Sequence, residues 1–161
     1  LTPAGEREAL TSIRRHRLVE VFLVSVMGFG WHEVHDEADA LGEVVTDSIV
    51  ERMEVMAGFP RRCPHGEPIP SPEGDLPPLD DILLSDAEEK QTLVITRVRT
   101  REPDRLEYLE ALGLLPGTPV EVIPHPVTGR GISASTCASR TSSSAATPRR
   151  TGRSCCPSPP T

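Results

Sequence analysis

Apolar side chains recur every three to four residues in the first third of the chain, which is the spacing of an amphipathic α-helix. The first predicted helix covers residues 2–27 and begins with a threonine N-cap followed by a proline. Its stretch 21–24 is apolar on every face, so we expect it to be buried on all sides, one of them against a second chain. Two further helices are predicted over residues 31–41 and 46–58.

The pattern changes after the third predicted helix. Residues 60–80 contain seven prolines, which predicts an extended linker without regular structure. Alternating apolar and polar positions then predict a strand over 91–100, a short helix over 102–112 and a second strand over 120–123. This order is typical of a small β-barrel with one inserted helix.

The last part of the chain, residues 133–161, contains no Val, Ile, Leu, Met, Phe, Trp or Tyr. So few apolar side chains do not offset the entropy of ordering, and we predict a disordered tail. Three of the four cysteines lie in this tail without a nearby histidine or a CxxC pair, so no metal site is expected there. Because a barrel needs more strands after Ile132, we hypothesise a frameshift near that residue, which translation of the other reading frames would test.

The net charge of −7 includes four arginines in the tail, so residues 1–132 carry −11. This acidity argues against a nucleic-acid-binding surface on these residues. No run of about 18 apolar residues predicts a membrane span. No secretory signal is visible either, and cysteines without such a signal favour reduced thiols in a cytoplasm.

Histidines and carboxylates share faces of the first two predicted helices. His16 and Glu20 are four residues apart, as are His35 and Asp39, and Glu43 follows four residues later. If the helices are antiparallel, these side chains form a ligand set for Mn²⁺, Fe²⁺ or Zn²⁺. The alternative is a solvated face with ordinary ion pairs, because acidic helices carry such spacings by chance.

Several other residues are interpreted without a role in metal binding. His32 is expected to be exposed at a helix start, while His65 and His125 lie beside prolines and are interpreted as loop residues. Cys63 is interpreted as a passive thiol. Trp31 fits either core packing or an interface.

Five runs of sequence carry a resemblance to known proteins. They are LTPAG at 1–5, HRLVE at 16–20, VHDEA at 34–38, PHGEPIP at 64–70 and LGLLPG at 112–117. The first four resemble the diphtheria-toxin-repressor family of metal-dependent transcriptional repressors. The last, with the region from about residue 79, resembles the SH3-like, FeoA-type domain that often ends these proteins.

The resemblance implies an N-terminal winged helix-turn-helix, a helical metal-binding and dimerisation domain, and the SH3-like domain. We therefore expect a mainly α-helical metal-binding and dimerisation domain at 1–59, a linker at 60–80, a small and incomplete SH3-like β-barrel at 81–132, and the tail at 133–161. Because the LTPAG run lies at a domain junction in the family, we expect the DNA-reading domain to be absent here.

The family's first metal site maps onto three residues of the first two helices. His16, Glu20 and His35 match its ligands, and Glu102 matches a carboxylate that the SH3-like domain adds. The resemblance therefore implies that this first site is intact.

The family's second metal site maps less well. Asp39 occupies a position held by Cys or Glu in different branches of the family. Gly42 and Glu43 stand where the family usually has Glu-His, and glycine offers no ligand. This site also normally takes a ligand from the N-terminal domain, so we expect it to be compromised. Oxygen ligands in place of thiolate and imidazole favour Mn²⁺ or Fe²⁺.

The resemblance implies an allosteric mechanism in which metal binding biases how a homodimer holds its DNA-binding domains. We expect this chain to be the cytoplasmic sensing and dimerisation part of a repressor of metal-homeostasis genes. Operator DNA would be contacted only through the missing N-terminal domain, with no membrane and no small-molecule substrate. Two alternatives are a dimerisation module with a vestigial metal site and a small metal-dependent hydrolase. No nucleophile with a paired base supports the hydrolase.

Overall fold

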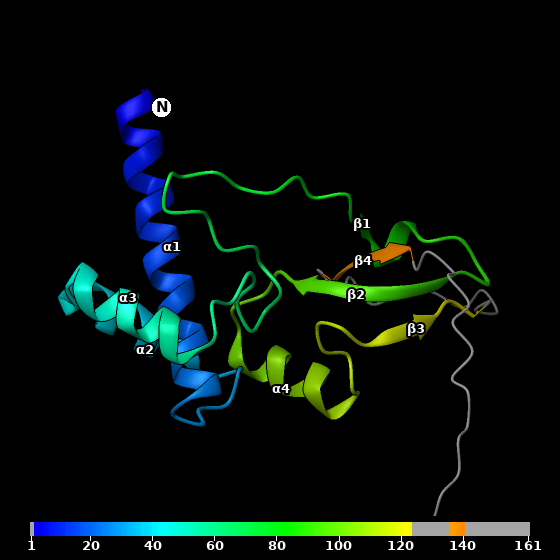
Figure 1. Cartoon of the computed structure of the whole chain (residues 1–161). Coiled ribbons are helices and arrows are strands. Elements are labelled where there is room, and N and C mark those ends of the chain that lie inside the picture. The colour runs from blue at the N-terminus through cyan, green and yellow to red at the C-terminus, as the bar shows by residue number, and fades with distance from the viewer. Residues whose placement is uncertain (1, 124–135, 141–161) are drawn as a thin grey trace, which may run out of the picture.

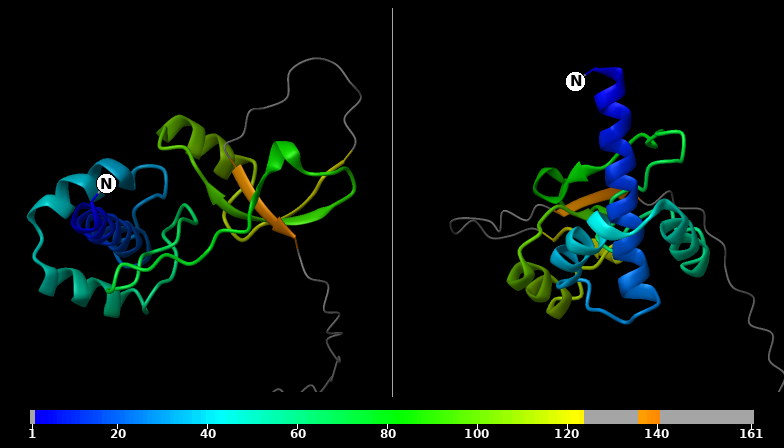
Figure 2. Two further views of the ribbon diagram at one scale, coloured as in Figure 1. Left: turned by 90° about the horizontal axis from the view of Figure 1, so that it is seen from above. Right: turned by 90° about the vertical axis from the view of Figure 1, so that its left-hand side faces the viewer.

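The computed structural model describes residues 2–123 and 136–140. Their elements are, in chain order, α1 (Pro3–Ser25), α2 (Val34–Val44), α3 (Asp47–Met56), β1 (Ile82–Leu83), the 3₁₀-helix η1 (Leu84–Asp86), β2 (Thr92–Val98), α4 (Pro103–Ala111), β3 (Pro119–Glu121) and β4 (Thr136–Arg140). Helices α1–α3 gather at one end of the molecule, and α4 lies with the sheet at the other (Figures 1 and 2).

The three helices predicted in the first third of the chain are confirmed. The α1 helix begins as predicted, because the Thr2 hydroxyl accepts a hydrogen bond from the Gly5 amide at 3.2 Å and Pro3 occupies the first turn. It ends at Ser25, and Gly28 then takes a φ of 79° that favours glycine. The second helix begins at Val34, three residues later than predicted.

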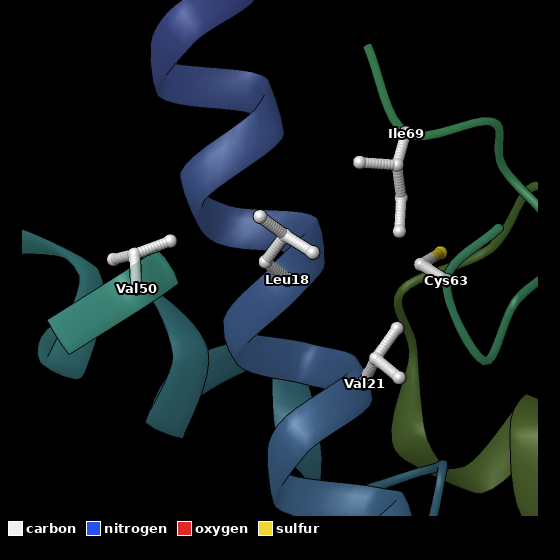
Figure 3. Packing of buried hydrophobic residues seen from close by; sticks show 5 residues of the cluster. All are labelled: Leu18, Val21, Val50, Cys63 and Ile69. Atoms are coloured by element: carbon white, nitrogen blue, oxygen red, sulfur yellow. The ribbon is translucent and has the colours of Figure 1, made fainter. Parts of the chain in front are cut away.

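The Pro-rich segment packs against α1. Figure 3 shows Leu18 of α1 between Val50 of α3 and the loop residues Cys63 and Ile69. Apart from one bridge between residues 62 and 68, residues 60–80 contain no strand or helix. The first half of the predicted linker is nevertheless part of the helical domain's core.

The second domain is a four-stranded antiparallel sheet in the order β1-β4-β2-β3, with α4 packed against it. The predicted strand over 91–100 and helix over 102–112 correspond to β2 and α4. The side chains of Ile95, Val98 and Leu106 form its core, and Trp31 from the α1–α2 connection packs into the same cluster. This contact brings the helical domain against the sheet domain.

The predicted disordered tail requires a correction, because Thr136–Arg140 form strand β4 between β1 and β2. Backbone amides and carbonyls make these strand pairs, so a lack of large apolar side chains does not prevent them. The small Ala138 is fully buried opposite Ile95. The rest of the predicted tail, residues 133–135 and 141–161, lies outside the described residues. Among the described residues, no helix is long and apolar enough to cross a membrane.

Candidate metal centre

A single buried carboxylate stands at the centre of the predicted site. The Glu20 side chain is 2% exposed and lies in the buried C-terminal part of α1. Its Oε1 atom lies 3.1 Å from Nε2 of His16, one turn earlier, and 2.7 Å from Nδ1 of His35 at the start of α2. Nδ1 of His65, in the Pro-rich loop, lies 3.5 Å from the same oxygen. Three segments of chain therefore converge on one oxygen atom.

The charge state of Glu20 follows from these neighbours. Burial alone would raise the pKa of its carboxyl, but the contacts with His16, His35 and His65 outweigh burial and hold the pKa far below its usual range. Glu20 is therefore ionised at neutral pH. A buried negative charge needs a partner, and a protein supplies either protonated bases or a cation.

The tautomer of the neutral His65 ring follows from its surroundings. Its Nε2 lies 2.7 Å from the carbonyl oxygen of Trp31, and a carbonyl only accepts hydrogen bonds, so Nε2 carries the proton. In the neutral ring, Nδ1 then presents a lone pair to Glu20 Oε1 and to the Cys63 sulfur at 3.9 Å. Three electron-donating atoms that face one another are an arrangement suited to a metal ion.

His35 provides the most direct test of whether a metal fits. Both ring nitrogens are buried without a hydrogen bond of regular geometry, although Nδ1 lies 2.7 Å from Glu20 Oε1. Buried polar atoms without partners are rare and costly in native proteins. The His35 ring is stacked on that of His65, with centroids 4.2 Å apart. A cation bound among these side chains would give one of the two orphaned nitrogens a partner.

Cys63 adds sulfur to the cluster. Burial, reinforced by the negative charge of Glu20, raises the pKa of the Cys63 thiol to about 12. At neutral pH the thiol therefore keeps its proton unless a cation lies beside it. Two donor sets result, and their ligand atoms all lie within 4.8 Å of one another in each set. They share Glu20, and they are His16–Glu20–His35 and Glu20–Cys63–His65.

Reasoning from sequence missed Cys63 and His65. The sequence predicts a passive thiol and a loop histidine, yet both residues are buried, at 6% and 2% exposure. The available signal was their spacing. Cys63 and His65 are two residues apart in a turn closed by a hydrogen bond from the Gly66 amide to the Cys63 carbonyl, with Pro64 between them.

The other predicted ligands lie at different distances from the cluster. Asp39 Oδ1 is 2.8 Å from His16 Nδ1, so this exposed carboxylate touches the cluster from outside. Glu43 lines a groove beside His16 and Asp39. Glu102 precedes α4 and is exposed, with its carboxylate 2.7 Å from Arg105. Within the described residues, the two metal-ligand groups include neither Glu43 nor Glu102.

The fold and the cluster define a two-domain protein, in which a helical domain carries a His/Glu/Cys cluster and a small antiparallel sheet domain follows. Sequence comparison gives the same two parts. Residues 2–71 match the family model described as iron dependent repressor, metal binding and dimerisation domain, and residues 82–132 match the FeoA domain. The chain belongs to the diphtheria-toxin-repressor family.

Among curated relatives, the chain is 29% identical over 133 residues to the diphtheria toxin repressor of Corynebacterium efficiens, covering 76% of this chain and 58% of that protein. It is 39% identical over 70 residues to the iron-dependent repressor IdeR of Mycobacterium tuberculosis, covering 44% of this chain and 30% of that one. The chain thus spans little more than half the length of the first of these relatives.

Solved structures agree in fold. A manganese-dependent transcriptional repressor aligns with a TM-score of 0.74 at 38% identity, over 76% of this chain and 67% of that chain. IdeR of T. acidophilum aligns with a TM-score of 0.74 at 31% identity, over 88% of this chain and 71% of that one.

Proposed function

We propose that this chain is the metal-sensing and dimerisation part of a transcriptional repressor that responds to Fe²⁺ or Mn²⁺. The observation that carries the proposal is the buried Glu20 carboxylate, with the orphaned nitrogens of His35 beside it. The relatives add support, because their names describe iron-dependent and manganese-dependent repressors.

In this proposal His16, Glu20 and His35 hold the metal, and His65 and Cys63 complete its surroundings. A bound divalent cation neutralises the buried carboxylate and stabilises Cys63 as a thiolate. Cys63 favours Fe²⁺ within the Fe²⁺/Mn²⁺ pair, because thiolate is a soft ligand and Mn²⁺ prefers oxygen.

Asp39 acts as a positioning residue in the proposed site. Its carboxylate accepts a hydrogen bond from His16 Nδ1–H at 2.8 Å, which leaves the His16 Nε2 lone pair directed toward Glu20 and the metal. Glu43 and Glu102 remain predicted ligands.

The proposed partners follow from the family. We propose a homodimer, in line with the dimerisation domain that residues 2–71 match. Apolar side chains near the end of α1 are available for it, with Val26 and Met27 exposed by 41% and 57%. We propose that the repressor contacts operator DNA through a winged-helix domain, acts in the cytoplasm and catalyses no reaction.

Calorimetry with Mn²⁺ and with anaerobic Fe²⁺ tests the proposal on the wild type, on His35→Ala and on His32→Ala. His32 is a matched control, because it lies one turn before His35 but outside both donor sets. We expect binding by the wild type and by His32→Ala, and a loss of at least about tenfold in affinity for His35→Ala. No heat in any of the three proteins would favour the vestigial-site alternative, while metal-dependent turnover of an ester or phosphoester would favour the hydrolase.

A further inference from the structure

The loop that carries Cys63 and His65 touches both domains. Its ligand side chains face Glu20 of α1, while its backbone lies against β2 of the FeoA domain. The amide of Val98 donates a hydrogen bond to the carbonyl oxygen of His65 at 2.8 Å. A proposed metal ligand is therefore bonded through its own backbone to the neighbouring domain.

Gly66 shows how closely the loop and β2 approach. A Cβ atom on Gly66 would lie 2.0 Å from the carbonyl oxygen of Thr96 and 2.7 Å from Cα of Arg97. Gly66 also has a φ of 86°, a conformation that side chains disfavour. The position thus requires glycine for two reasons, and the first of them places the loop directly on the strand.

Ion pairs on both sides hold Glu67, the residue that follows Gly66. Glu67 accepts a hydrogen bond from Nη1 of Arg97 at 3.0 Å, and Arg97 Nε lies 2.6 Å from Asp81. On the other side, Arg17 of α1 approaches Glu67 at 3.4 Å and also donates to the Pro68 carbonyl. Glu67 therefore links a guanidinium of the helical domain to one of the FeoA domain. The Arg97 and Arg17 side chains are only 15% and 19% exposed.

We propose that Arg97 is a positioning residue for the metal centre, which acts through Glu67 to hold the turn that carries Cys63 and His65. Docking of the FeoA domain is then thermodynamically coupled to metal binding by Cys63 and His65. Each favours the other by the same factor, because coupling free energies are reciprocal. The inference rests on the proposed metal-sensing function and adds a means of regulation to it.

The test uses Co²⁺ as the probe on the whole chain. Co²⁺ bound to a thiolate gives an intense charge-transfer absorption, which reports on Cys63 itself, and Cys63→Ser identifies that band by its loss. Trp31 supplies a second signal, because it is the one tryptophan of the chain and stacks on His65 at a centroid distance of 5.5 Å. Its fluorescence should therefore change when Co²⁺ binds His65.

Three variants are compared with the wild type: Arg97→Ala, Arg97→Lys and Arg52→Ala. Arg52 is the control, because it is exposed on α3 and lies outside the residues that line the cavity at the metal centre. We expect Arg97→Ala to weaken Co²⁺ binding at least about tenfold, as loss of such supporting groups does in metal sites. Arg52→Ala should bind like the wild type, and Arg97→Lys should recover part of the affinity.

Urea unfolding of the metal-free proteins identifies any variant that fails to fold, and Glu67→Gln then takes the place of Arg97→Ala, since it removes the same charge pair. If a folded Arg97→Ala or Glu67→Gln protein binds Co²⁺ like the wild type, this inference is overturned and the proposed function stands. If the wild type gives no Co²⁺ signal, the proposed function fails and the inference with it.

The reciprocal effect gives an independent readout. Residues 75–80 are exposed and contain Leu79, after which chymotrypsin can cleave, whereas Leu76 is followed by a proline that blocks cleavage. Saturating Co²⁺ should slow this cleavage in the wild type, because metal binding favours the docked FeoA domain. It should slow cleavage less in Arg97→Ala, whereas equal protection in both proteins would contradict the coupling.

Discussion

The two domains differ in the kind of side chain that fills their interiors. In the FeoA domain, Leu93, Ile95 and Leu106 are fully buried, and the enclosed carboxylate of Asp81 is paired with Arg97. In the helical domain, Glu20 is as deeply buried as its neighbours Leu18 and Val19. An apolar core stabilises by burial alone, whereas the stability of a buried carboxylate depends on the bases and cations that surround it. The comparison predicts one domain whose stability is independent of metal and one whose stability depends on it.

The largest expected effect is on the apolar core. Leu106→Ala should lower the free energy of unfolding by about 3 kcal/mol, because it removes a fully buried side chain and leaves a cavity. The exposed Leu112→Ala is the control, with an expected change below about 0.5 kcal/mol. Urea titrations with and without Mn²⁺ measure both. Equal losses in the two variants would mean that Leu106 is not part of a tightly packed core.

The second effect concerns the polar centre. Glu20→Gln should weaken metal binding about 100-fold, which corresponds to about 2.7 kcal/mol, because the neutral amide offers a cation little attraction. The exposed Glu51→Gln on α3 serves as the control and should bind normally. Calorimetry gives the affinities. Unfolding curves should show that Mn²⁺ stabilises the wild type and not Glu20→Gln. If Mn²⁺ stabilised both proteins equally, the helical domain would not depend on metal through Glu20.

Sequence patterns predicted the local features of both domains and missed the tertiary ones. The helix start at Thr2 and the face shared by His16 and Glu20 depend on residues within four positions, so periodicity and capping rules predicted them. His65 reaches Glu20 only because a Pro-rich loop without periodicity folds back on α1. The strand of Thr136–Arg140 likewise depends on backbone pairing with a distant strand, which its composition does not reveal.

The third prediction concerns the contact between the domains. Gly66→Ala should lower the free energy of unfolding by about 2 kcal/mol, because it adds both backbone strain and a clash with Thr96. Gly74→Ala is a matched control, since its φ of 91° is equally strained but its Cβ would meet nothing closer than 3.7 Å. The difference in urea midpoint between the two variants isolates the close approach. Equal losses would show that the loop moves away from β2 without cost.

The smallest effect tests the ion pair that anchors the FeoA side of this contact. Burial alone would raise the pKa of Asp81, but hydrogen bonds and charge attraction from Arg97 outweigh it and hold the pKa below its usual range. A lowered pKa in the folded state contributes stability that is fully present above the usual value of about 3.9 and is lost as the pH falls through the folded value. Asp81→Asn should therefore cost about 1 kcal/mol at pH 7 and progressively less below about pH 4, as urea unfolding at each pH would show. Asp80→Asn, at the exposed neighbouring residue, is the control and should cost little stability at any pH. If Asp81→Asn lowered the free energy of unfolding equally at every pH, the shape of the Asp81 side chain and not its charge would be responsible.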